Sequence, residues 1–166
     1  HPYYQRDGDP AAIWDLMGNG GTSVPEFIGW HRFELGWLNE SEVLCLSTSD
    51  LKTQTVMLAP INSKASWKKF VMVGIDSTKA LGIEVRRASK YDRLATYEEG
   101  TIVYLIDVTK GDDEGIISIL GKKATTKEGQ TLESLQTAEK ITYQGITVKV
   151  AASGKSGDRI EISSSQ

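Results

Sequence analysis

Cysteine is almost absent from this sequence. Cys45 is the single example, so no disulfide can form within the chain. It lies in an apolar stretch, Val43-Leu44-Cys45-Leu46, where a thiol ordinarily acts as a small hydrophobic side chain. We therefore expect Cys45 to be buried and not to serve as a nucleophile. The lack of disulfides is compatible both with the cytosol and with many exported bacterial proteins.

Histidine is also scarce, with only His1 and His31 in the chain. A catalytic zinc needs three protein ligands and an open position for water. Two of those ligands usually come from a His-Glu-x-x-His helix, and that motif does not occur here. His31 stands between Trp30 and Arg32 on an expected helix, where packing is the simpler role. We therefore expect no catalytic residue and no metal ligand, so the chain alone should not be catalytic.

Long apolar runs and an excess of one charge are both missing. No segment approaches the roughly 18 apolar residues of a membrane span. The net charge is −3 with the two signs interspersed, which argues against a nucleic-acid partner. The chain opens on His1 without an initiator Met or a signal peptide, so we expect a further segment upstream.

Other catalytic and ion-binding patterns are weak. No Gly-x-Ser-x-Gly elbow is present, and the glycine-rich segment 18–21 lacks the Lys-Ser/Thr of a phosphate-binding loop. Asp7 and Asp9 are candidate calcium ligands, although their spacing is not that of a calcium-binding hand. Solvated acids in a turn are the alternative for this pair.

One helix is expected near the N-terminus. Ser23 and Glu26 have the spacing of a capping box, and Pro25 suits a first helical turn. The pattern predicts a helix over Val24–Leu35, with Gly36 in the left-handed position that ends it. Trp30 and Trp37 should be buried by this helix.

From residue 41 onward the sequence is typical of an antiparallel β-sandwich or jelly roll. Short runs of alternating, β-branched residues are separated by frequent turn clusters. Thr101–Asp107 is almost continuously apolar, which predicts a central strand covered on both faces. We divide the chain into a loop and helix over residues 1–40 and a β-sandwich over 41–166. The expected strands are Glu42–Ser47, Thr55–Ala59, Phe70–Ile75, Ala80–Arg87, Thr101–Val108, Ile116–Leu120, Lys140–Tyr143, Ile146–Ala151 and Arg159–Ile162.

One stretch resembles a known family. Trp14-Asp15-Leu16-Met17, a Gly-rich loop, and a helix ending in Leu35-Gly36-Trp37-Leu38 are similar to secreted bacterial metallopeptidases of the immune-inhibitor-A type. The match covers residues 13–38, and segments 81–87 and 100–108 resemble strands of the family's accessory β-sandwich more loosely. The second segment departs from the family, because Leu105 or Ile106 stands where a His is common.

The resemblance implies a role for each matching residue. Met17 would be the Met-turn residue, and with Trp14 and Asp15 it would form the floor of the active site without binding zinc. Trp30 and Trp37 would be packing residues. Residues 1–40 would be the remnant of a catalytic domain, and the parent would be a secreted or cell-surface peptidase that cleaves a peptide or protein with a zinc-activated water. The zinc helix would precede residue 1.

Two alternatives remain open. The chain is also compatible with a non-catalytic β-sandwich module that binds glycan or protein at a cell surface, with exposed tyrosines stacking on sugar rings. The candidates for that stacking are Tyr91, Tyr97, Tyr104 and Tyr143. The other alternative is a purely structural spacer or a degenerate peptidase relic.

Overall fold

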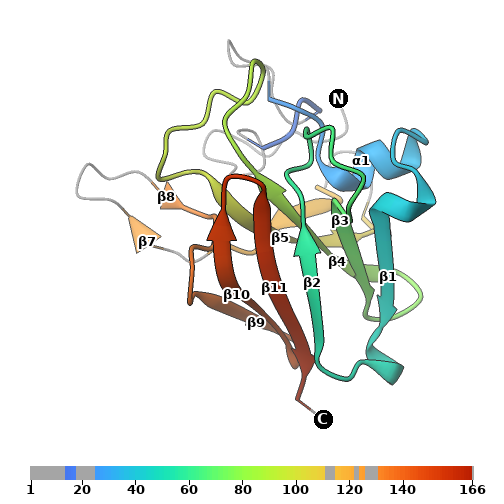
Figure 1. The fold of residues 1–166 in the computed structure, drawn as a ribbon. Coiled ribbons are helices and arrows are strands. Elements are labelled where there is room, and N and C mark those ends of the chain that lie inside the picture. The colour runs from blue at the N-terminus through green and yellow to red at the C-terminus, as the bar shows by residue number, and fades with distance from the viewer. Residues whose placement is uncertain (1–13, 18–24, 111–114, 122–123, 126–130, 166) are drawn as a thin grey trace.

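The computed structural model describes residues 14–17, 25–110, 115–121, 124–125 and 131–165. These residues form one short helix, two 3₁₀ turns and eleven strands. Figure 1 shows the strands in two layers, with α1 beside the rear sheet. The elements are α1 (Gly29–Glu34), η2 (Glu40–Glu42), β1 (Val43–Ser47), η3 (Thr48–Asp50), β2 (Gln54–Leu58), β3 (Phe70–Gly74), β4 (Lys79–Arg86), β5 (Gly100–Asp107), β6 (Ile117–Ile119), β7 (Ala124–Thr125), β8 (Thr131–Leu132), β9 (Lys140–Tyr143), β10 (Ile146–Gly154) and β11 (Gly157–Ser164).

The predicted fold class is confirmed. A five-stranded sheet in the order β1-β3-β4-β5-β6 faces a four-stranded sheet in the order β2-β11-β10-β9, as in a β-sandwich. Neighbouring strands are antiparallel except for β1 and β3, which run parallel. β7 and β8 form a separate two-stranded ribbon. The nine predicted strands all occur, with their ends within three residues of the predicted ones.

The main hydrophobic core lies between the two sheets. Alternate residues of β4, Leu81, Ile83 and Val85, point into it, because successive side chains of a strand point to opposite faces. Val148 and Val150 of β10 meet them from the other sheet, and all five side chains are at most 1% exposed. The apolar residues that alternate along these strands in the sequence are thus the ones that face this core.

A second apolar cluster covers the outer face of the five-stranded sheet. Phe70, Ile102 and Tyr104 point away from the main core and pack with Trp14 and Ile28 of the N-terminal segment. β5 is consequently buried along its whole length, which confirms the predicted central strand with two covered faces. The N-terminal segment therefore acts as a third layer on the sandwich.

The expected start of the helix is wrong. α1 begins at Gly29, and residues 25–28 are not helical, with Ile28 in an extended conformation. The expected capping residue, Ser23, lies outside the described residues. The predicted end is confirmed, because Gly36 adopts φ +68° and Trp37 N–H donates to the carbonyl of Arg32 at 2.8 Å.

Two burial expectations are also wrong. Cys45 is exposed, because β1 is an edge strand and Cys45 faces away from the main core that its neighbours Leu44 and Leu46 contact. Trp37 is 57% exposed, since it follows the left-handed turn at Gly36 and leaves the helix surface. The described part of the chain has no helix with the length and apolar character needed to cross a membrane.

Candidate functional site

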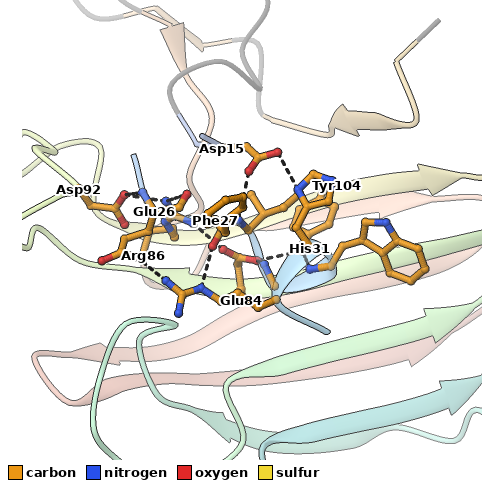
Figure 2. A network of polar contacts seen from close by, with 12 residues as sticks. Asp15, Glu26, Phe27, His31, Glu84, Arg86, Asp92 and Tyr104 are labelled. Carbon is orange, nitrogen blue, oxygen red and sulfur yellow. Dashed lines mark hydrogen bonds and ion pairs between the residues drawn. The ribbon is translucent and has the colours of Figure 1, made fainter. Parts of the chain in front are cut away.

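A buried polar network joins the N-terminal layer to the sandwich (Figure 2). It begins on β4, where Glu84 and Arg86 point to the outer face and are 0% exposed. Tyr104 of β5 lies beside them, opposite Gly82, where a Cβ atom would overlap the tyrosine ring. Glycine at position 82 therefore makes room for the aromatic ring that completes this surface.

Glu84 is the centre of the network. Its Oε2 accepts hydrogen bonds from the Gly29 backbone N–H at 2.5 Å and from the Tyr104 hydroxyl at 2.9 Å. Its Oε1 accepts one from Arg86 Nη1 at 2.9 Å. Tyr104 in turn accepts the Trp30 backbone N–H at 3.2 Å. Side chains of the sheet thus supply the acceptors for the first N–H groups of α1, which water cannot reach at this buried helix start.

Arg86 extends the network to the loop after β4. Its Nη2 donates to Asp92 Oδ1 at 2.7 Å and to the carbonyl of Glu26 at 3.2 Å. Asp92 Oδ1 also accepts the Glu26 backbone N–H at 2.7 Å, so the backbone of Glu26 is held at both its N–H and its carbonyl. Arg86 Nε and Asp92 Oδ2 have no hydrogen-bond partner among the described residues, so this ion pair is not bidentate.

Burial and neighbouring charges shift the pKa values of Arg86 and Tyr104. Burial alone lowers the pKa of Arg86, but the carboxylates of Glu84 and Asp92 outweigh that effect and raise it. Burial, reinforced by the negative charge of Glu84, raises the pKa of the Tyr104 phenol well above its ordinary value. Arg86 is therefore permanently charged in the network, and Tyr104 is a neutral hydrogen-bond donor.

Asp15 and His31 form a second polar contact across the layer. His31 Nδ1 lies 2.9 Å from Asp15 Oδ2, and the two residues are 5% and 3% exposed. Asp15 Oδ1 accepts the Ile28 backbone N–H at 3.4 Å. This contact holds the Trp14–Met17 turn against α1, and His31 is a buried helix residue that packs on the turn.

Trp14 anchors the same turn from its other side. The indole is 1% exposed, and its Nε1–H donates to Glu133 Oε2 at 2.5 Å. Met17, at the end of the turn, is 38% exposed. The structure therefore brings Trp14 and Asp15 into the protein and leaves Met17 at its surface.

The remaining predicted residues are placed separately. Trp30 is half-buried against the outer cluster, and its ring centroid lies 6.2 Å from that of Phe33. Trp37 packs edge-on against Phe27, with centroids 5.3 Å apart. The two tryptophans thus contact different phenylalanines. Asp7 and Asp9 lie outside the described residues.

Sequence reasoning missed Glu84, Arg86 and Asp92. The available signal was the pair Glu84 and Arg86, two residues apart and therefore on one face of a strand that is otherwise apolar. Charges in that pattern ordinarily mark the wet face of an antiparallel sheet. Only the tertiary packing of residues 14–17 and 25–31 shows that this face is covered.

The network holds the N-terminal layer on the sandwich through buried hydrogen bonds and ion pairs. Glu84, Arg86 and Asp92 are at most 1% exposed, so a substrate cannot reach their polar atoms in the folded chain. No group of three or more His, Cys, Asp or Glu side chains in the described ranges could hold a metal ion. The described residues thus do not fit a zinc site. Comparison of the chain with family models, with curated proteins and with solved structures found no match.

Proposed function

We propose that this chain is the C-terminal portion of a secreted zinc metallopeptidase-like protein and is inactive alone. Its role is to hold the Trp14–Met17 turn as a floor beneath an active site. The zinc ligands belong to an upstream catalytic segment, and the parent protein acts on a peptide or protein substrate. The proposal rests on the resemblance of residues 13–38 and on the way that the sandwich holds this stretch.

The attachment of the turn is the observation that carries the proposal. Trp14 and Asp15 are buried and hydrogen-bonded, whereas Met17 of the same turn lies at the surface. A residue that supports a reacting centre must be held in place by packing and hydrogen bonds behind it. The turn has this organisation, because Trp14 is bonded to Glu133, Asp15 is bonded to α1, and Met17 is exposed to a neighbouring segment.

The experiment compares this chain with a longer protein that joins it to the preceding segment of its own gene. Zinc content and hydrolysis of casein are measured for both. The longer protein should bind one zinc and cleave casein, and this chain alone should do neither. A longer protein that binds no zinc and cleaves nothing contradicts the proposal.

A pair of methionine variants tests the role of the turn in the longer protein. Met17→Ala should lower casein hydrolysis about 10- to 100-fold, as removal of an outer support of a metal site does. Met57→Ala is the matched control, because Met57 is 46% exposed but belongs to the distant strand β2. Equal effects of the two substitutions would show that the Trp14–Met17 turn has no special role.

A glycan-binding module is the second candidate, and it is favoured by two exposed tyrosines. Tyr91 and Tyr97 are 51% and 40% exposed on the loop between β4 and β5. Tyr104 is fully buried and Tyr143 packs against the main core, so these two are removed from the stacking candidates. Loss of glycan binding in Tyr91→Ala or Tyr97→Ala would support this candidate.

A further inference from the structure

A polar pocket lies at one end of the sandwich, on a different set of side chains from the buried network. It has a volume of about 490 Å³ and is formed by the loop between β4 and β5, the β10–β11 hairpin and the segment before β9. Figure 1 shows this loop, in yellow-green, close to the tip of the hairpin, in red. The side chains that line it include Arg87, Thr96, Glu99, Gln136, Ser153 and Lys155.

Arg87 gives the pocket a fixed wall. Its Nη2 pairs with Asp158 Oδ1 and donates to Ser153 Oγ and to the carbonyl of Gly154, both at 3.0 Å. Asp158 is 0% exposed and also accepts from the hydroxyls of Thr101 at 2.8 Å and Ser153 at 2.7 Å. The guanidinium is therefore immobilised, and its charge is balanced within the protein.

The opposite wall is held by Glu99 and Gln136. Glu99 Oε1 accepts the Ala88 backbone N–H at 2.7 Å, and Gln136 Nε2 donates to the Glu99 carbonyl at 2.6 Å and to Ser134 Oγ at 3.2 Å. These contacts orient both side chains. Within the described part of the chain, Glu99 Oε2 and the Gln136 amide oxygen retain capacity to accept further hydrogen bonds.

The charges of the residues that line the pocket favour a neutral ligand. The Arg87–Asp158 pair is neutral, and the exposed Lys155 ammonium is offset by the Glu99 carboxylate. An anion would meet Glu99 and a cation would meet Lys155, whereas a neutral ligand with several hydroxyl groups meets donors and acceptors together.

From these observations we infer that the pocket between the β4–β5 loop and the β10–β11 hairpin binds a neutral sugar unit of a glycan. Gln136, Glu99 and Lys155 hydrogen-bond the sugar hydroxyls. The site is independent of the Trp14–Met17 turn. Its failure would therefore leave the proposed peptidase support untouched, and the reverse also holds.

The test is a titration of the isotopically labelled chain, followed by amide resonances, with cellobiose, maltose, lactose and diacetylchitobiose. Glucuronate and inorganic phosphate serve as charged comparators. At least one neutral disaccharide should shift the amides of segments 96–99 and 153–157 and of Gln136 at millimolar concentration. The absence of such shifts with all four sugars, or shifts produced only by the anions, overturns the inference.

Variants assign the binding to the pocket. Gln136→Ala should raise the Kd about tenfold, the effect of one lost hydrogen bond. Lys155→Ala removes an exposed side chain and should weaken binding without any effect on folding. Gln54→Ala is the control, because Gln54 is exposed on β2 outside the pocket. Equal weakening by Gln54→Ala would show that the sugar binds elsewhere.

Discussion

The carboxylate of Glu84 in β4 accepts the backbone N–H of Gly29 in α1, across 55 residues of sequence, at 2.5 Å. This bond places the start of the helix on the sheet, in a position where α1 has no side-chain N-cap. The same carboxylate accepts hydrogen bonds from Tyr104 and Arg86, so one residue links the helix to two strands and pairs with a buried arginine. The consequences can be measured.

Glu84→Ala should lower the free energy of unfolding by about 3–5 kcal/mol, because Arg86 keeps only Asp92 to balance its buried charge and the Gly29 N–H and the Tyr104 hydroxyl lose their acceptor. Urea unfolding at neutral pH measures this change. Glu161→Ala is the control, since its pair with Lys149 is 39% and 44% exposed and should contribute about 0–1 kcal/mol. A loss from Glu84→Ala no larger than that of the control would show that the network is not a fastening.

Gly29→Ala should destabilise the protein by about 1–3 kcal/mol, although alanine is the better helix former. A Cβ at position 29 would lie 2.7 Å from Phe70 Cδ2 and 2.8 Å from Glu84 Oε2. Gly74→Ala provides the comparison, because its Cβ would meet only the Leu46 carbonyl at 3.6 Å. Thermal unfolding of both variants should show a clear decrease for position 29 and little change for position 74.

The pair of Glu42 and Lys69 should make stability depend on acid pH. Lys69 Nζ lies 2.5 Å from Glu42 Oε1, and this hydrogen bond, with that from the Asn39 backbone, lowers the pKa of Glu42. The contribution is therefore complete above the ordinary carboxyl pKa of about 4.3 and is lost as the pH falls through the lower pKa of the folded state.

Denaturant unfolding of the original chain and of Glu42→Gln, from neutral pH to pH about 2, isolates this contribution. The original chain should be more stable than the variant at neutral pH, and the difference should shrink as Glu42 becomes protonated. A difference that stays constant over this range would refute the assignment.

Cys45 should react with a maleimide while the protein is folded, because its side chain is exposed at the edge strand β1. One equivalent of label per chain is expected from mass spectrometry in the absence of denaturant. Cys45→Ser should take up none. Labelling that occurs only after urea is added would place the thiol inside the protein.

Most of the fold could be predicted because it depends on local patterns. Leu81, Ile83 and Val85 alternate because they face the inter-sheet core from one side of β4. The apolar run of β5 is continuous because both faces of that strand are covered. β7 and β8 were missed, since two residues each are too few to show a period. The sequence predicts that β10 ends at Ala151 and that β11 begins at Arg159. The observed strands continue to a two-residue turn, Lys155-Ser156.

The network could not be predicted because its partners are distant in sequence. Gly29, Glu84 and Tyr104 come from three elements, and each has an ordinary local explanation. The start of α1 was misplaced for the same reason. The N–H groups of residues 26 and 28–30 are satisfied by tertiary side chains and not by an N-cap, so the capping-box spacing at 23 and 26 did not mark the start.

The five-stranded sheet separates two cores, so the described N-terminal residues that cover its outer face contribute no side chain to the core between the sheets. If the layer came away, Glu84 and Arg86 would face water from β4, as charges on the open side of an antiparallel sheet commonly do. The inter-sheet core would keep all its own side chains. The sandwich could thus form first and receive the layer afterwards, with the charged groups hydrated until the helix arrives.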